Sequence, residues 1–419
     1  MTGQASILIH ARGRQTADEC AFWNRLSGDL RRLGAALKVV AHHPPASGVE
    51  FEMAVIENGL DFAPEHRDSE PAYGGWTRDD LLDREAFWRG SAGDRGRRLR
   101  AGGLGYYADR YGGWLDAWRP SLVVIWNGQH AQELVLEGLC RERAIPLAWV
   151  ERGPLAGTLH FDMRGVLGGS WAADASVRWS NDEEQRRWSE VFASLRERAV
   201  RRTWWEQPGA CTRDVHARLG IPDGARVIGF AGQVDRDAQN LLYSPSFDRN
   251  LDAFSWLLHA AASSEAWFIS GKHHPRSDTP AEAYAELCEG RPAAWTSDVP
   301  VGAWLGVCDR FAAINSATLF EAMLRGIPSL ALGRGVFSGK GAFYEVDDPA
   351  RSAETVSAWL AGAGAEERSA RFADLCAWLL SDHLIATDPR DEALGLHGTR
   401  TLAERLLAWS CVPAEGVPS

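Results

Sequence analysis

Four apolar runs in the second half of the chain constrain its fold more than any other feature. They span residues 226–231, 266–270, 310–314 and 329–332, and polar residues follow each run at once. Each run has the length of a buried strand. Strands that alternate with helical patterns predict a parallel sheet. The polar residues after these strands should therefore gather at one edge of the sheet, where open α/β sheets bind ligands.

The first half shows the same pattern. Residues 6–10, 37–41, 121–126 and 147–150 are predicted strands, and a helical stretch from about 16 to 33 follows the first of them. Polar residues again follow the strands at 121–126 and 147–150. The sequence thus predicts a second sheet of the same kind in this half.

The length of the chain, 419 residues, is too great for one typical core. We expect an α/β protein with two Rossmann-like domains, the N-terminal one at residues 1–206 and the C-terminal one at 207–365. Residues 366–419 are predicted helices that pack back toward the N-terminal domain. An amphipathic helix over 180–206 is the predicted bridge out of the first domain, with Ser180 and Glu183 spaced as a capping box.

Charge and composition exclude several classes of protein. A formal net charge of −11 argues against broad nucleic-acid binding, which needs a basic face. No apolar run approaches the ~20 residues of a membrane span, and the N-terminus shows no secretion signal. The seven cysteines are scattered without CxxC spacing, as is typical of reduced thiols rather than of a disulfide or zinc framework. We therefore expect a cytoplasmic protein.

Three carboxylates are the candidate catalytic groups. Asp235 and Asp237 follow the predicted strand at 226–231, beside Gln233. One of them could attack the anomeric carbon of a sugar, while the alternative is a pair of surface-loop acids. Glu151 ends a strand of the first half and could act as a general acid/base. The alternative for Glu151 is a salt bridge to Arg152.

Six further residues, Gln233 among them, are candidates for binding an anionic ligand. A cation at Lys272 and an imidazole at His274 could stabilise a departing phosphate, with a solvated turn as the alternative. Ser316, which follows Asn315, could cap the next helix or share its free N–H groups with a phosphate. The Glu321 carboxylate suits ribose hydroxyls. A zinc site is not expected, because no His/Cys pair has ligand spacing.

Together these blocks resemble the bacterial capsule-polysaccharide synthesis family, which includes the retaining β-Kdo transferases. The resemblance covers roughly residues 120–345. The blocks that carry it are Glu151-Arg-Gly with Asp162 and Gly165, Gln233-x-x-x-Asp237-x-Gln239, Lys272-x-His274-Pro275, Ser316-x-x-x-x-Glu321-Ala322 and Gly326-x-Pro328.

The resemblance implies a GT-B-type glycosyltransferase, with two Rossmann-like domains facing a central cleft. It implies CMP-Kdo as donor, retention of configuration, and no cofactor or metal. By the same resemblance, Asp237 is the nucleophile, with Asp235 as its competitor, and Glu151 is the acid/base. His274 would bind the CMP phosphate, and Ser316 and Glu321 would hold the phosphate and the ribose or cytosine.

Two alternatives stay open. One is a transferase that uses another CMP- or UDP-sugar on the same fold, and the other is a non-catalytic glycan-binding subunit of a polysaccharide assembly complex. The expected partners are the donor and a glycan or glycolipid acceptor, without nucleic acid. Association with the inner face of the membrane or with an assembly partner is left open. An Arg/Gly-rich stretch at 91–105 could meet an anionic acceptor or form a solvated helix face.

Overall fold

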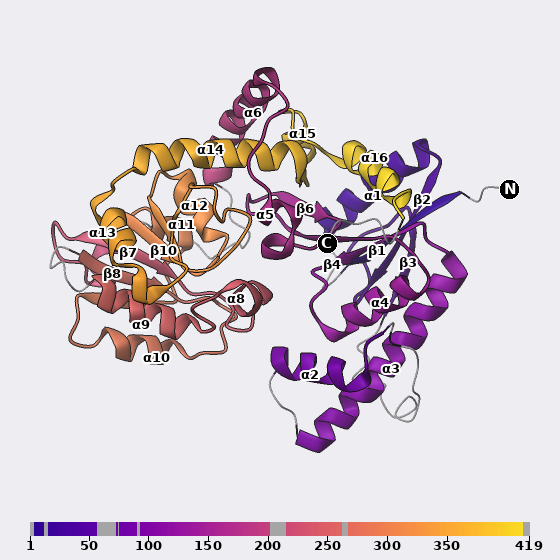
Figure 1. The fold of residues 1–419 in the computed structure, drawn as a ribbon, viewed down its shortest axis with the longest axis horizontal. Helices are drawn as coiled ribbons and strands as arrows, with labels where there is room; N and C mark the ends of the chain where they lie inside the picture. Colours follow the sequence, from indigo (N-terminus) through magenta and orange to yellow (C-terminus); the bar gives the residue numbers. More distant parts are fainter. Residues whose placement is uncertain are drawn as a thin grey trace. The chain divides into compact units, whose positions relative to one another are not determined.

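The computed structural model describes residues 4–11, 16–56, 73, 75–89, 93–201, 215–261 and 267–413 (Figure 1). Its contacts divide the chain into two compact units. The first unit contains Met1–Arg152, Thr158–Val166 and His383–Ser419, and the second contains Gly153–Gly157 and Leu167–Asp382. The boundary predicted at residues 206 and 207 lies outside the described residues.

The first unit is built on a sheet whose described strands lie in the order β13-β6-β5-β4-β1-β2-β3. The strands β1 to β5 are parallel to their neighbours, whereas β6 and β13 are antiparallel additions at one edge. The strand bounds are β1 Ala5–Ala11, β2 Ala35–Ala41, β3 Glu52–Val55, β4 Leu122–Trp126, β5 Leu147–Arg152, β6 Thr158–Asp162 and β13 Leu384–Ala386.

Helices cover both faces of this sheet, which explains why its central strands are continuous apolar runs. One core combines the sheet with Phe22 of α1 and Leu402 of α16, and the other combines it with Tyr111 of α3 and Val135 of α4. The helices of this unit are α1 Ala17–Arg32, α2 Arg78–Arg89, α3 Gly93–Trp118, α4 Ala131–Glu142, α15 Pro389–Glu392 and α16 Thr399–Ser410.

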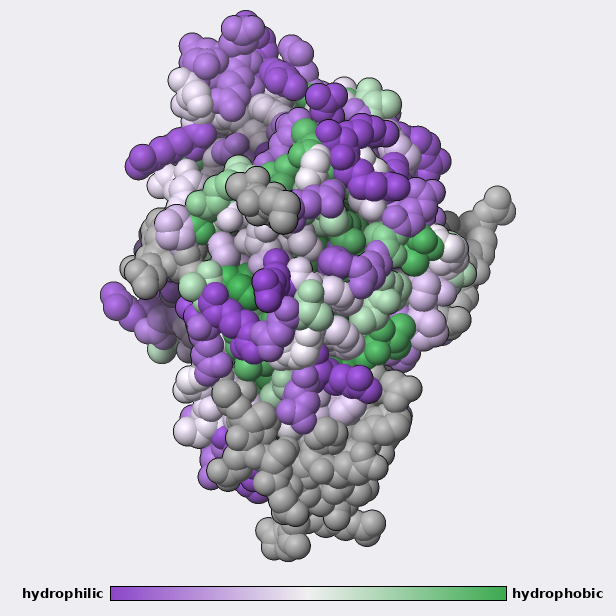
Figure 2. All heavy atoms as spheres, turned by 90° about the vertical axis from the view of Figure 1, so that its right-hand side faces the viewer, coloured by the Kyte–Doolittle hydropathy of each residue, from purple (hydrophilic) through white to green (hydrophobic). Residues whose placement is uncertain are grey.

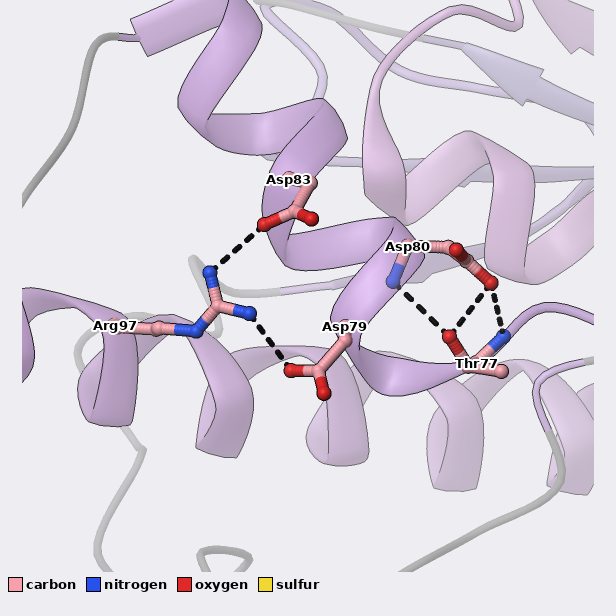
Figure 3. A network of polar contacts seen from close by, with 5 residues as sticks. All are labelled: Thr77, Asp79, Asp80, Asp83 and Arg97. Atoms are coloured by element: carbon pink, nitrogen blue, oxygen red, sulfur yellow. Dashed lines mark hydrogen bonds and ion pairs between the residues drawn. The ribbon is translucent and has the colours of Figure 1, made fainter.

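A polar network fixes the start of α2 and joins it to α3 (Figure 3). The Thr77 hydroxyl accepts from the Asp80 backbone N–H at 3.1 Å, and the Asp80 carboxylate accepts from the Thr77 hydroxyl at 2.6 Å. Arg97 of α3 donates to Asp79 at 2.7 Å and to Asp83 at 2.8 Å, four residues apart on α2. In the Arg-rich stretch, Arg97 therefore binds two neighbouring acids of its own unit.

The second unit contains a fully parallel sheet with the strand order β12-β11-β10-β7-β8-β9. This is the 3-2-1-4-5-6 order of the Rossmann fold, and it reverses between β7 and β10. The strand bounds are β7 Arg226–Ala231, β8 Trp267–Lys272, β9 Ala293–Thr296, β10 Arg310–Ala313, β11 Ser329–Ala331 and β12 Tyr344–Glu345.

Helices surround this sheet as well, and Phe254 of α9 and Trp359 of α13 pack in the core of one face. The α-helices are α5 Trp171–Asp174, α6 Asp182–Arg201, α7 Val215–Leu219, α8 Ala238–Tyr243, α9 Asn250–Ala261, α10 Ala281–Cys288, α11 Val301–Leu305, α12 Thr318–Leu324, α13 Ala353–Ala361 and α14 Ala365–Asp382. Two 3-10 helices span Leu167–Gly169 and Pro349–Arg351.

The helix predicted as a bridge is held within the second unit. Asp374 of α14 accepts from Trp179 Nε1 at 2.9 Å and from Gln185 Nε2 at 3.0 Å. At its other end, Arg325 donates to the Val200 carbonyl at 2.7 Å. The helix α6 also starts later than predicted, because the Asn181 side chain, not Ser180, accepts from a first-turn N–H, that of Glu184, at 2.9 Å.

The predicted fold class, α/β with two Rossmann-like parts, is confirmed, and each strand predicted from the sequence is present. The tail differs from the helical prediction, because β13 Leu384–Ala386 joins the first sheet. No described helix is long and apolar enough to span a membrane. On the face drawn in Figure 2, hydrophobic side chains lie in separate patches between hydrophilic ones. The described cysteines are all free thiols.

Candidate functional site

The second sheet changes direction between β7 and β10, and predicted site residues follow both strands. Gln233 Nε2 donates to Asn315 Oδ1 at 3.0 Å, and the Asn315 backbone N–H donates to Gln233 Oε1 at 3.0 Å. Asn315 Nδ2 also donates to the carbonyls of Gln239 and Arg334, at 2.7 and 3.2 Å. These bonds join the loops after the two strands at the point where a doubly wound sheet binds its ligand.

Asp235 is held by the loops around it. Its Oδ1 accepts from Asn250 Nδ2 at 2.9 Å, and its Oδ2 accepts from the Ser277 hydroxyl at 2.6 Å and the Thr279 backbone N–H at 3.1 Å. Burial alone would raise the pKa of Asp235, but the hydrogen bonds from Asn250, Ser277 and Thr279 lower it overall. Both oxygens are therefore engaged, Oδ1 with the start of α9 and Oδ2 in holding the loop after β8 against the loop after β7.

Asp237 has a different environment. It is the N-cap of α8, where its Oδ1 accepts from the Gln239 backbone N–H at 2.9 Å. Among the described residues, no side chain or backbone group forms a hydrogen bond with its Oδ2. Burial raises the pKa of Asp237, although the bond from Gln239 and the charge of Arg276 oppose this. Asp237 thus has one fixed oxygen and one oxygen available for chemistry.

Lys272, the last residue of β8, is a buried cation at the same edge of the sheet. Its residue surface is 6% exposed, and its ammonium has no hydrogen-bond partner in the described part of the chain. Burial lowers the pKa of Lys272, and the nearby charge of Asp298 opposes this. A buried ammonium without a partner is unfavourable, so an anionic ligand would complete its environment.

His274 offers a neutral donor close in sequence to this cation. Its Nδ1 accepts from the Arg276 backbone N–H at 3.1 Å, so the Nε2 atom carries the proton of the neutral ring. Burial, followed by the charge of Arg276, lowers the pKa of His274 to about 4. At neutral pH His274 can therefore donate one hydrogen bond to a phosphate without adding charge.

Ser316 lies two residues before α12, a helix of seven residues, and Glu321 lies within that helix. The Ser316 hydroxyl accepts from the Thr318 backbone N–H at 3.2 Å and donates to the Thr318 hydroxyl at 3.1 Å, so it makes a local turn before the helix, whose N-cap is Ala317. Glu321 is 8% exposed, and its Oε2 has no described hydrogen-bond partner. Burial raises the pKa of Glu321 to about 7, while the charge of Arg325 opposes this.

Glu151 belongs to the first unit, whereas the other eight predicted site residues belong to the second. Its Oε2 accepts from Asn127 Nδ2 at 2.9 Å, and its Oε1 accepts from the Arg152 backbone N–H at 2.9 Å. Asn127 follows β4 with a left-handed φ of 62°. These contacts fix the carboxylate at the carboxyl ends of β4 and β5, in the position that the sequence predicted.

Asn250 is a supporting residue that the sequence analysis missed. It is fully buried at the start of α9, where its Oδ1 accepts from the Gln233 N–H at 3.1 Å. Its Nδ2 donates to the Gln233 carbonyl at 3.1 Å and to Asp235. Asn250 therefore holds the backbone that leads from β7 to both acids. A polar residue at the start of an otherwise apolar helix was the available signal.

Comparison with known proteins supports the sequence resemblance for part of the chain. Residues 178–357 match the family model described as "Capsule polysaccharide biosynthesis protein". The match contains the eight predicted residues of the second unit and excludes Glu151. A search of the curated proteins finds no significant match.

Several solved structures have a distant likeness to the chain. KpsC of Thermosulfurimonas dismutans, a beta Kdo 2,7 transferase, is 17% identical, with 60% of this chain and 79% of that chain covered and a TM-score of 0.38. The glycosyltransferase SnogD of Streptomyces nogalater is 14% identical, with coverage of 97% and 100% and a TM-score of 0.35. A glycosyltransferase of Rickettsia africae is 8% identical, with coverage of 96% and 99% and a TM-score of 0.41.

Proposed function

Because residues 178–357 match the family model for capsule polysaccharide biosynthesis proteins, we propose that the chain is a retaining β-Kdo transferase. It would move Kdo from CMP-Kdo to a glycan or glycolipid acceptor in surface-polysaccharide synthesis. The observation that carries the proposal is the arrangement at the edge of the second sheet. There the buried ammonium of Lys272 stands at the end of β8, and Asp237, whose Oδ2 has no described hydrogen-bond partner, follows the neighbouring parallel strand β7.

Donor binding would use the groups that lack a partner within the second unit. The Lys272 ammonium and the His274 Nε2–H would bind the phosphate of CMP-Kdo and stabilise the negative charge that develops as CMP leaves. The Glu321 carboxylate would accept hydrogen bonds from the ribose hydroxyls. The Ser316 hydroxyl already bonds to Thr318, so its contribution to phosphate binding would depend on a change of its hydrogen bonds.

The first chemical step would form a covalent intermediate. Asp237 Oδ2 attacks the anomeric carbon of Kdo, and the bond between that carbon and the phosphate oxygen breaks with its electron pair leaving on CMP. Asp235 is a weaker candidate for this role, because hydrogen bonds occupy both of its oxygens. Its bonds to Asn250 and Ser277 instead position the loop that carries Asp237.

The second step would transfer the sugar. Glu151 removes the proton of the acceptor hydroxyl, and the resulting oxygen displaces Asp237 from the anomeric carbon. Asn127 and the Arg152 backbone N–H orient the Glu151 carboxylate for this task. Two successive inversions at one carbon give net retention, as in retaining glycosidases.

Intact-protein mass spectrometry tests the donor and the nucleophile together. The chain is mixed with CMP-Kdo without acceptor, alongside Asp237→Ala and the control Asp278→Ala, which changes an exposed acid of a nearby loop. We expect a mass increase of one Kdo residue in the unmodified chain and the control, and none in Asp237→Ala. An adduct that persists in Asp237→Ala would exclude this nucleophile.

Repeating the assay with added acceptors and with other nucleotide-sugars separates the alternatives. CMP release that occurs only with acceptor, without an adduct, would indicate a retaining mechanism without a stable intermediate. Turnover of a UDP-sugar instead of CMP-Kdo would identify a different donor. Donor binding without turnover under any acceptor would replace the proposal with a glycan-binding role.

A further inference from the structure

A second cluster of polar groups lies in the first unit, apart from the residues assigned to the donor. His160, Asp162 and His383 are 1%, 5% and 6% exposed. One possible ligand atom from each residue lies within 4.8 Å of those of the other two. The mechanism above uses none of these three side chains.

The antiparallel edge of the first sheet brings the cluster together. His160 and Asp162 lie two residues apart on β6 and therefore share a face of the sheet. His383 precedes β13, which pairs with β6 through Leu384 opposite His160, and its carbonyl accepts from the Phe161 N–H at 3.4 Å. The two imidazole rings lie edge to face with centroids 5.7 Å apart.

His160 is the residue that most needs an additional partner. Neither of its ring nitrogens forms a hydrogen bond with any described residue, although the side chain is almost completely buried. A neutral imidazole has one donor and one acceptor, and a buried polar group that is left unpaired destabilises the folded protein. Burial also lowers the pKa of His160 to about 4, so the ring is neutral at pH 7 and has a lone pair to offer.

The chemistry of the three groups suits a transition metal. Two imidazoles and one carboxylate are ligands that Zn²⁺ takes, whereas Mg²⁺ and Ca²⁺ prefer sites made of oxygen atoms. The Asp162 carboxylate is already oriented, because its Oδ1 accepts from the backbone N–H groups of Arg164 at 2.7 Å and Gly165 at 3.3 Å. Such outer hydrogen bonds are typical of ligating carboxylates.

We propose that His160, Asp162 and His383 bind one divalent transition-metal ion, with Zn²⁺ as the probe of choice. Tetrahedral coordination at bond lengths of 2.0–2.1 Å separates ligand atoms by about 3.3 Å. Because the three atoms lie within 4.8 Å of one another, they would approach by at most about 1.5 Å on binding the ion. The ion would complete the coordination of a buried ring that no described group satisfies.

The site has a structural purpose that follows from its position in the chain. His383 is the residue at which the chain returns to the first unit. An ion shared by His160 and His383 would fasten β13 to β6 and so hold the C-terminal segment in the first sheet. His160 also lies opposite Glu151 in the β5–β6 pair, so the ion would stabilise the strand that borders the proposed acid/base. The metal site itself does not depend on the proposed transferase activity.

Metal uptake by the full chain tests the proposal directly. The protein is stripped with a chelator, supplied with Zn²⁺ or Co²⁺, desalted and assayed for metal content and for Co²⁺ absorption. We expect one ion per chain. His160→Ala and His383→Ala should weaken binding by more than the roughly 10–100-fold that loss of an outer partner costs. His259→Ala, which removes an exposed histidine of α9, should keep full uptake.

A further variant gives a positive signature that a purely structural histidine would not produce. In His160→Cys the new thiolate should bind Co²⁺ and add an intense sulfur-to-metal charge-transfer absorption. Folded, stripped protein that takes up neither Zn²⁺ nor Co²⁺ would overturn the proposal. So would uptake that persists unchanged in His160→Ala and His383→Ala. Either result would identify the cluster as a buried polar contact without a metal.

Discussion

Gln233 and Asn315 exchange two hydrogen bonds of 3.0 Å across the point where the second sheet reverses its strand order. One bond joins the two side chains, and the other fixes the Asn315 backbone. Gln233 follows β7 and Asn315 follows β10. The pair therefore determines how the loop with Asp235 and Asp237 lies relative to the loop with Ser316.

A double-mutant cycle should detect this pairing as coupling. Gln233→Ala leaves the Asn315 amide without its partner and should lower the free energy of unfolding by about 1–3 kcal/mol. The double variant Gln233→Ala/Asn315→Ala should cost less than the sum of the single changes, with a coupling energy of about 0.5–3 kcal/mol. Urea denaturation gives the free energy of unfolding of the unmodified chain, the two single variants and the double variant. If the losses of the two single variants are simply additive in the double variant, Gln233 and Asn315 do not stabilise each other.

Of the two acids after β7, Asp235 should matter for the stability of the protein, whereas substitution of Asp237 should leave stability nearly unchanged. Asp235→Ala removes the acceptor for Asn250, Ser277 and Thr279 and should lower the free energy of unfolding by about 2–3 kcal/mol. Asp237→Asn keeps a good N-cap for α8, so stability should change by no more than about 0.5 kcal/mol.

Sugar transfer should instead depend more on Asp237 than on Asp235. Asp237→Asn should reduce sugar transfer at least about 1,000-fold, because it removes the proposed nucleophile. Asp235→Asn, which keeps one acceptor oxygen and adds an amide donor, should retain more activity than Asp237→Asn. Donor consumption and urea denaturation of the same samples provide the two readouts. Equal activity of the two variants would argue against Asp237 as the attacking group.

Much of this arrangement was predictable, because apolar runs followed by polar residues identify buried parallel strands and the edge where their loops meet. The strand at 226–231 was predicted with the bounds that the structure gives it. The strands β6 and β13 were missed, although the polar and apolar alternation of Thr158–Asp162 was an available signal for β6, whereas Leu384–Ala386 has only three residues. Their pairing joins segments that are more than two hundred residues apart.

The positions of candidate site residues were predictable where they stand at the end of a strand, as Lys272 and Glu151 do. Supporting residues such as Asn250 were not, because their partners come from other parts of the chain. The different states of Asp235 and Asp237 depend on loops 40 or so residues away, so adjacent positions in the sequence could not distinguish them. The cluster of His160 and His383 was hidden for the same reason.

Lys272→Met should separate ligand binding from folding. Methionine has a similar length and no charge, so it removes a buried ammonium that no described group satisfies. We expect the free energy of unfolding to stay constant or rise, while affinity for CMP falls about 10–100-fold through loss of a charge-assisted hydrogen bond. Calorimetric titration with CMP and urea denaturation measure the two effects.

Lys38→Met is the matched control for this change. Lys38 pairs with Glu52 on the first sheet, and its loss should leave CMP affinity unchanged. A Lys272→Met protein that binds CMP as tightly as the unmodified chain would exclude Lys272 from the donor site. A large loss of stability in that variant would show instead that the ammonium has a structural partner.

Glu321 should give the second unit a pH-dependent stability with a defined sign. Burial raises its pKa in the folded state from 4.5 to about 7. Below pH 4.5 the carboxyl is protonated in both the folded and the unfolded state, and burial carries no charge penalty. As pH rises from 4.5 to 7 the unfolded state loses its proton first, so this group lowers the free energy of unfolding, and the effect is complete above pH 7.

Glu321→Gln removes that penalty and should therefore stabilise the protein at pH 8 by roughly 1–3 kcal/mol, but not at pH 4.5. Because other groups titrate alike in both proteins, their contribution cancels in the difference between the free energies of unfolding of the variant and the unmodified protein. Glu286→Gln, at an exposed position of α10, is the control and should show no such dependence. If the Glu321 carboxylate also binds ribose, the stabilised variant should bind CMP more weakly at pH 8. A stability difference that is the same at both pH values would show that the Glu321 carboxyl does not titrate between them.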